Sequence, residues 1–255
     1  MHETDLIRVL GPIDLMTAAG ETSVGSAMSR RLLGALVLGA GRAIPISRLQ
    51  WSLWGDHPPT SADSSIQTYV SRLRRHLGGD VIVRVDHSYQ LHAAREQIDA
   101  IRFEELVTLA TETGDDAESR RSICHEALAL WRGDPFGEFV DEEPFRLEAK
   151  RLDRLRISVI ELALESELEL GHTEIAAAEL ESITEEYPYR ERLWYLLIEA
   201  LLRDGQRVKA LRVGQRLREH LRAAGLEPSH ELRDLEARVF DERDQPAAFD
   251  SVYHG

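Results

Sequence analysis

The segment from Pro58 to Leu91 limits the possible folds of this chain more than any other. Apolar residues recur in it at helical spacing, and two glycines stop the predicted helix. Two short runs rich in β-formers follow, Val81–Val85 and Tyr89–Leu91, and are predicted to pair through a turn at Asp86-His87-Ser88. The apolar stripe consists of Ile66, Val70, Leu73 and Leu77. The segment therefore predicts one amphipathic helix followed at once by a small hairpin.

The polar positions of this helix carry amide, hydroxyl and guanidinium groups. A helix with such a face, followed by a hairpin, suits a winged helix laid in the major groove of DNA. Arginines near a helix C-terminus also complement the helix dipole, and such a face is often simply solvated. From this segment alone both interpretations stay open. The side chains concerned are Gln67, Thr68, Ser71, Arg72, Arg74 and Arg75.

The charge of the chain is divided unevenly. The net charge is -14, yet residues 1–95 hold ten arginines and no lysine against eight acidic residues. Beyond residue 95 there are 21 basic and 37 acidic side chains. We therefore expect a local basic face on the first part, and an acidic remainder that faces away from a DNA duplex.

Several classes of protein are disfavoured by what the sequence lacks. The single Cys124 excludes an internal disulfide framework, suits a reducing cytoplasm, and is predicted to be a buried small residue. No apolar run is long enough to span a membrane, and the first residues have no signal-peptide pattern, so a cytoplasmic protein without membrane partners is expected. No phosphate-binding glycine loop or metal-ligand spacing occurs. We expect no cofactor, no metal and no catalysis.

Before Pro58 the sequence predicts two strands and two helices. The strands are Leu6–Leu10 and Ile13–Met16, and Gly20-Glu21 is a turn candidate. The first helix runs from Ser29 to Leu38 with an interruption at Gly34, and the second is capped by Ser47. For the helix of the opening segment, Thr60 or Ser61 is the candidate cap, and Thr60-x-x-Asp63 has the spacing of a capping box.

Beyond Arg95 one helix is predicted after another. Their ranges are Ile98–Thr111, Glu118–Trp131, Glu143–Leu170, Thr173–Tyr187, Arg190–Arg203, Gln206–Ala224 and His230–Phe240. Gly171 and Gly205 are 34 residues apart, as are Ala176 and Ala210, and this is the tetratricopeptide period. Trp194 stands where such a repeat opens. A generic helical array with coincident glycines is the alternative.

Several longer motifs resemble those of the Streptomyces antibiotic regulatory protein family. They are Leu10-Gly11-Pro12, Leu53-Trp-Gly-Asp56, Pro58-Pro-Thr-Ser-Ala-Asp63, Ile66-Gln-Thr-Tyr-Val-Ser-Arg-Leu-Arg-Arg75, Trp131-Arg-Gly-Asp134 and Tyr187-Pro-Tyr-Arg-Glu-Arg-Leu-Trp194. The resemblance implies a mostly α fold with small β elements. An OmpR-like winged helix would occupy residues 1–95, a bacterial transcriptional activator domain of tetratricopeptide-like helices residues 96–240, and a flexible tail residues 241–255. It also implies the short form of the family, without an ATPase or phosphopeptide-recognition module.

By this resemblance the protein is expected to activate transcription of a secondary-metabolite pathway. It would bind direct repeats in double-stranded DNA near a promoter, beside a second copy of itself, and engage RNA polymerase holoenzyme. The DNA-contact candidates are Gln67, Thr68, Ser71, Arg72, Arg74 and Arg75, with Arg84 in the wing. Ser88-Tyr89-Gln90 departs from the usual wing, which has Gly before Tyr and Arg after it. The alternatives are a tetratricopeptide-like protein-interaction scaffold or ligand-sensing regulator with weak or no specific DNA binding, and a repressor.

Overall fold

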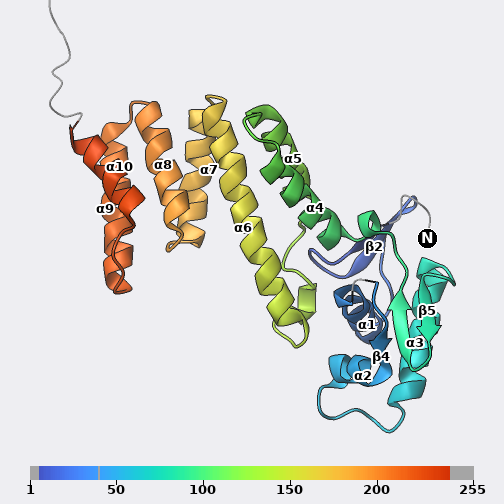
Figure 1. Ribbon diagram of the computed structural model, residues 1–255. Coiled ribbons are helices and arrows are strands. Elements are labelled where there is room, and N and C mark those ends of the chain that lie inside the picture. Colours follow the sequence, from blue (N-terminus) through green and yellow to red (C-terminus); the bar gives the residue numbers. More distant parts are fainter. Residues whose placement is uncertain (1–5, 40, 242–255) are drawn as a thin grey trace, which may run out of the picture. The chain divides into compact units, whose positions relative to one another are not determined.

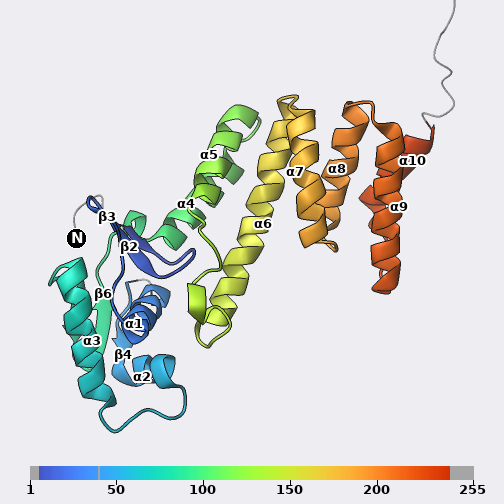
Figure 2. The same cartoon turned by 180° about the vertical axis from the view of Figure 1, so that it is seen from behind.

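The computed structural model describes residues 6–39 and 41–241 (Figures 1 and 2). The fold is mostly helical with two small sheets, as predicted. Contacts divide the chain into two compact units: unit 1 lies within residues 1–114 and 122–160, and unit 2 within residues 115–121 and 161–255. Apart from Asp241, the predicted tail lies outside the described residues.

The first sheet of unit 1 has three antiparallel strands in chain order, β1 (Leu6–Arg8), β2 (Asp14–Thr17) and β3 (Gly20–Thr22). The sequence predicted the first two, but the expected turn at Gly20-Glu21 is wrong, because these residues open the third strand. Thr17 pairs with Gly20 across the sheet, so the turn is Ala18-Ala19, two residues earlier than predicted. The Thr17 hydroxyl closes this turn by donating to the Gly20 carbonyl at 3.1 Å and accepting from the Ala19 amide at 3.2 Å.

Three helices and a second sheet follow. The helices are α1 (Ala27–Leu38), α2 (Ile46–Trp54) and α3 (Ala62–Leu77). The second sheet joins β4 (Ile44–Pro45), β6 (Ser88–Leu91) and β5 (Ile82–Val85) in that order. Every member of the predicted α3 stripe is at most 1% exposed, and both α1 and α2 contact α3. The predicted order of strands, helices and hairpin is therefore confirmed.

Of the predicted helix caps, Ser47 is wrong, whereas Ser61 has the predicted N-cap position of α3 without a side-chain cap. Helix α2 begins at Ile46, with Pro45 before it, so Ser47 lies inside the helix. Ser61 precedes α3 but makes no capping hydrogen bond through its side chain. The Asp63 carboxylate accepts from Gln50 Nε2 of α2 at 2.5 Å, so the capping box is not formed. A hydrogen bond between α2 and α3 therefore takes the place of the predicted capping box.

Helix α1 continues through Gly34, contrary to the predicted interruption. A Cβ atom at this position would lie 2.8 Å from Ile13 Cδ1 and 2.9 Å from Phe145 Cε1. We expect Gly34→Ala to lower the free energy of unfolding by about 1–3 kcal/mol, because overpacking outweighs the gain in helix propensity. Urea unfolding of the full chain measures this. The matched control is Gly79→Ala, where nothing lies within 4 Å of the added methyl group, and equal effects of both changes would contradict the packing argument.

Unit 1 continues past the hairpin. It includes the 3-10 turns η1 (Arg95–Gln97) and η2 (Gly137–Phe139) and helix α4 (Asp99–Glu112). Helices α5 (Ala117–Ala129) and α6 (Phe145–Glu169) each contribute residues to both units. Around η2, the Phe136 and Phe139 rings lie 5.1 and 5.8 Å from the Phe145 ring. Thus segments after residue 95 complete the core beneath the first sheet and α1.

Unit 2 is built from α7 (Thr173–Glu186), α8 (Glu191–Arg203), α9 (Arg207–Ala223) and α10 (His230–Asp241), with the end of α6. The turns at Gly171 and Gly205 make equivalent hydrogen bonds 34 residues apart. Their amides donate to Leu168 and Leu202 at 3.2 and 3.0 Å, and the next amides donate to Glu167 and Leu201 at 2.9 and 2.8 Å. The predicted 34-residue period is therefore present. All these helices agree with the predicted ranges to within two residues.

Candidate nucleic-acid interface

Helix α3 presents a row of polar side chains to solvent. Gln67, Thr68, Ser71, Arg72 and Arg75 are exposed, on the opposite side from the buried stripe. Thr68 donates its hydroxyl to the Ser64 carbonyl at 2.9 Å, one turn back in the same helix. In the described structure no hydrogen bond or ion pair engages the side chains of Gln67, Ser71, Arg72 and Arg75. Those four side chains are therefore available to a ligand.

Arg74 is placed differently from its neighbours. It is half-buried, and its Nε donates to the Ile82 carbonyl at 2.8 Å. This hydrogen bond ties the last turn of α3 to β5, and Figures 1 and 2 show the helix and the hairpin side by side. Sequence reasoning grouped Arg74 with the other arginines because periodicity does not reveal a contact to the following strand. The structure gives Arg74 a role in positioning the hairpin.

The hairpin β5–β6 turns through two residues. Val85 pairs with Ser88, so the connection is Asp86-His87, and Ser88 belongs to β6 instead of to the predicted turn. Asp86 has a φ of 49°, the left-handed conformation that Asp tolerates better than most residues. Arg84 is exposed beside it, and its Nε donates to the Asp86 carbonyl at 3.2 Å. Its guanidinium makes no other hydrogen bond or ion pair within residues 6–39 and 41–241.

A third strand fixes the base of this hairpin. Ile44 of β4 pairs with Tyr89, and the Ile46 amide donates to the His87 carbonyl at 2.9 Å. Tyr89 is buried, whereas Gln90 donates through Nε2 to the Gly41 carbonyl. The side chain after the tyrosine thus holds the loop before β4. Helix α2, helix α3 and the hairpin are linked as one platform.

The first sheet is joined to the segments after residue 95 by a buried carboxylate. Asp99 begins α4 and is 0% exposed. Its oxygens accept the Val9 amide at 2.8 and 2.9 Å and the Leu10 amide at 3.0 Å. Burial raises the pKa of Asp99 to about 6, although these amides and the charge of Arg132 act in the opposite direction. The partners are some ninety residues apart in sequence.

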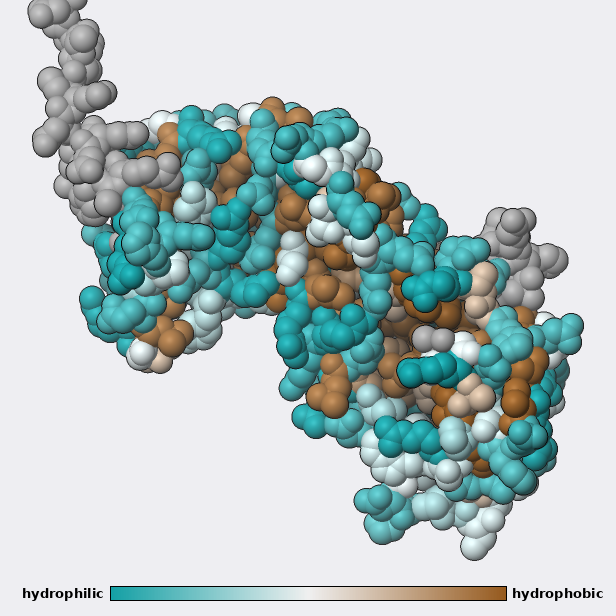
Figure 3. All heavy atoms as spheres, viewed as in Figure 1, coloured by the Kyte–Doolittle hydropathy of each residue, from teal (hydrophilic) through white to brown (hydrophobic). Residues whose placement is uncertain are grey.

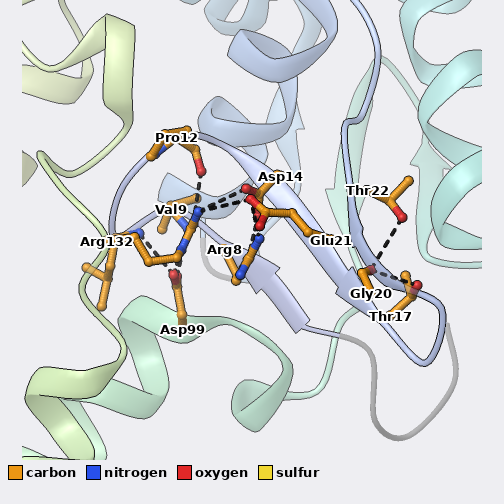
Figure 4. A network of polar contacts seen from close by, with 11 residues as sticks. Arg8, Val9, Pro12, Asp14, Thr17, Gly20, Glu21, Thr22, Asp99 and Arg132 are labelled. Atoms are coloured by element: carbon orange, nitrogen blue, oxygen red, sulfur yellow. Dashed lines mark hydrogen bonds and ion pairs between the residues drawn. The ribbon is translucent and has the colours of Figure 1, made fainter.

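Arg132 completes the same junction, which Figure 4 shows. Its amide donates to the Leu10 carbonyl at 2.8 Å, and its guanidinium donates to Asp14 and to the Pro12 carbonyl, each at 2.9 Å. A Cβ on Gly11 would lie 3.0 Å from the Arg132 Cβ, so only glycine allows this approach. The motifs Leu10-Gly11-Pro12 and Trp131-Arg-Gly-Asp134 therefore interlock. Sequence reasoning noted both motifs but not their contact.

The described parts of the chain offer little support for other kinds of site. Residues 6–39 and 41–241 contain no cluster of three or more His, Cys, Asp or Glu side chains suited to a metal ion. None of the helices in these ranges is both long and apolar enough to cross a membrane. Cys124 is 0% exposed, as predicted. The α3–hairpin platform remains the strongest candidate site.

Comparison with known proteins first defines a class. Residues 98–240 match the family model described as "Bacterial transcriptional activator domain", which places the chain in the class of proteins that contain this domain. It is 34% identical over 239 residues to the regulatory protein AfsR of Streptomyces griseus, covering 91% of this chain and 24% of that protein. It is 32% identical over 249 residues to the regulatory protein DnrI of Streptomyces peucetius, covering 91% of each. The chain belongs to the Streptomyces antibiotic regulatory protein family, as its motifs indicated.

A solved structure has the same fold. Mycobacterium tuberculosis EmbR, in complex with a low affinity phosphopeptide, superposes with a TM-score of 0.88 at 29% sequence identity. The match covers 95% of this chain and 66% of the EmbR chain. The chain thus spans about a quarter of AfsR and two thirds of the EmbR chain, but nearly all of DnrI.

Proposed function

We propose that unit 1 contains an OmpR-like winged helix-turn-helix that binds duplex DNA sequence-specifically. In this proposal α3 enters the major groove and the β5–β6 hairpin is the wing. The observation that carries it is the exposed α3 face, on which two arginines, an amide and a hydroxyl have no partner within the described chain. Most arginines elsewhere in the described residues are paired with carboxylates. Unpaired donors of these types match the edges of guanine and adenine and the phosphate backbone.

The contact candidates divide into two roles. Gln67, Ser71 and Arg72 project from the middle of α3, and we assign them to base edges. Thr68, Arg75 and Arg84 are assigned to phosphates, Arg84 from the wing. Arg74 acts on DNA mainly through the hairpin that it positions. The proposal requires no catalysis and no cofactor.

The helices after residue 95 are proposed to supply protein contacts. We infer that unit 2 is tetratricopeptide-like, because its two helix pairs share a 34-residue period and equivalent turns. Two copies would bind direct repeats on one face of a duplex, about one helical turn apart, in the cytoplasm. The activator domain would then engage RNA polymerase holoenzyme. The names of the relatives DnrI and AfsR, both regulatory proteins, support this reading.

Transcription with purified components tests the sign of regulation. The template is a promoter preceded by two copies of the selected operator, and the full chain is titrated with RNA polymerase holoenzyme. We expect transcript yield to rise, and to return to the basal level when the operator is scrambled. A fall in yield on the intact operator would instead make the protein a repressor.

A further inference from the structure

Two neighbouring helices of unit 2 carry opposite net charges. Helix α7 has five glutamates and no basic residue, which gives it a charge of -5. Helix α9 has five arginines and one lysine against a single glutamate, which gives it a charge of +5. Hydrophilic side chains predominate over unit 2 in the view of Figure 3. The overall acidity of the chain conceals this separation.

Within one chain, two ion pairs join these helices. Lys209 of α9 pairs with Glu181 of α7, and Arg216 pairs with Glu185. The spacing from 181 to 185 and from 209 to 216 places each pair on the sides of the helices that face one another. The contact shows that the α7 and α9 sequences can lie side by side and exchange ion pairs.

A second stripe on each helix has no partner within the part of the chain that the structure describes. On α7, Ile175 is 62% exposed, and Glu179 and Glu186 follow at intervals of four and seven residues, on the same face. On α9, Val208 is 66% exposed, and Arg212 and Arg222 share its face. None of the four charged side chains makes a hydrogen bond or ion pair within the described residues. The α7 stripe therefore combines one exposed apolar residue with two unpaired negative charges. The α9 stripe combines one exposed apolar residue with two unpaired positive charges, and the exposed Glu219 lies on the same face, so the stripe keeps a net positive charge.

We propose that the α9 stripe of one copy docks on the α7 stripe of a second copy of this chain. The α7 stripe comprises Ile175, Glu179 and Glu186, and the α9 stripe comprises Val208, Arg212 and Arg222. This proposal rests on the proposed binding to direct repeats. Copies on direct repeats have the same orientation, so their contact joins two different surfaces, which must be complementary. One acidic and one basic stripe on the same unit meet that condition, whereas a two-fold contact of either stripe with itself would oppose like charges.

The strength of such a contact suits assembly on DNA. Exposed ion pairs are individually weak and are screened by salt. Two copies held on adjacent sites, however, have a high effective concentration for one another, so a weak contact produces cooperativity without dimers in free solution. We expect the second copy to bind about tenfold more tightly than the first at low salt, and less so as salt is raised.

Charge reversal in four variants of the full chain tests the proposal. The acidic-stripe variant is Glu179→Arg with Glu186→Arg, and the basic-stripe variant is Arg212→Glu with Arg222→Glu. A third variant carries all four changes, and Glu181 and Lys209 are left intact so that the internal pairs remain. A fourth, Glu227→Arg with Glu231→Arg, is a surface control outside both stripes. Each is titrated onto labelled duplexes with one selected operator site or two in tandem, after circular dichroism confirms the fold.

The proposal predicts a specific pattern. The acidic-stripe and basic-stripe variants each lose cooperativity on the tandem duplex, while binding to one site is unchanged. The variant with all four changes regains cooperativity, because the charges are again opposite. An equimolar mixture of the two stripe variants also regains it, since one order of the two copies retains both native stripes.

Other patterns would overturn it. Unchanged cooperativity with lost transcription would assign the stripes to polymerase. If the basic-stripe variant loses single-site affinity and has a shallower salt dependence, Arg212 and Arg222 contact DNA instead. Failure of the four-change variant to recover would refute the pairing of these two stripes. Absence of specific single-site binding by the unaltered chain would count against the proposed function itself, and so is distinguishable from loss of cooperativity alone.

Discussion

Replacing Arg72 and Arg75 together by alanine is expected to weaken operator binding by about a hundredfold. A good contact to a base edge, as proposed for Arg72, is worth about 1–3 kcal/mol, the phosphate contact proposed for Arg75 adds to it, and 1.4 kcal/mol corresponds to a factor of ten in affinity. Both side chains are exposed and have no partner in the described chain, so their removal costs the fold little. Fluorescence anisotropy with a labelled operator duplex measures the loss. Urea unfolding of the same variant shows whether the fold is intact.

The single variants separate base from phosphate contacts. If Arg75 contacts phosphate, Arg75→Ala lowers affinity for all sequences and makes the salt slope shallower by about one. If Arg72 contacts a base edge, Arg72→Ala relaxes the preference at one operator position. The matched control is Arg102→Ala on α4, where the arginine is exposed but paired with Glu126. Equal affinity and salt slope in all three variants would remove α3 from the interface.

Replacing Asp99 by asparagine is expected to lower the free energy of unfolding by about 1–3 kcal/mol at neutral pH. The carboxylate satisfies two buried amides, those of Val9 and Leu10. An asparagine offers one oxygen and turns an NH₂ group toward them, so a buried donor is left unsatisfied. Urea unfolding of the full chain, followed by circular dichroism, measures the change. Asp80→Asn, at an exposed position, is the control and should be close to neutral.

The pH dependence of this effect has a definite sign. Burial raises the pKa of Asp99 to about 6 in the folded state, from an ordinary value of 3.8, so the folded protein favours the protonated form. This contribution to stability is complete below about pH 4 and is lost as pH rises through 6. The deficit of Asp99→Asn should therefore be larger at pH 5 than at pH 7.5, by about 1 kcal/mol. A deficit that grows with pH would mean that the ionised form is the one favoured by folding.

Local periodicity accounts for what could be predicted from the sequence. The α3 stripe and the helices of unit 2 repeat their apolar residues at helical spacing, and glycines with positive φ mark the turns at 171 and 205. The exposed polar residues of α3 follow from the same periodicity, because they occupy the positions that the stripe leaves free. Of the candidate site, the sequence therefore predicts which α3 side chains face solvent, with Arg74 as the exception.

Contacts between distant segments account for the rest. Asp63 turns to Gln50 of the preceding helix, Arg74 to β5, and Asp99 to amides some ninety residues earlier. No local pattern encodes such pairs. In the sequence, Asp99 follows Ile98 at the start of a predicted helix and therefore resembles an ordinary acidic residue of a first helical turn. The short third strand was missed for a local reason: Gly20 is a turn former, yet it opens a strand and pairs with Thr17 three residues earlier. The joint between the sheet and Arg132 therefore needed the structure.

Selection from a random duplex pool by the full chain, at near-physiological salt, tests sequence-specific binding most directly. The Arg72→Ala, Arg75→Ala double variant is selected in parallel as a control. We predict that the unaltered chain enriches a short motif repeated in tandem at about one helical turn, and that the double variant enriches none. Absence of a motif with the unaltered chain, or the same motif with both, would contradict the account. Absence of a motif would favour a protein-interaction scaffold. The same motif with both proteins would place the DNA contacts outside these two arginines.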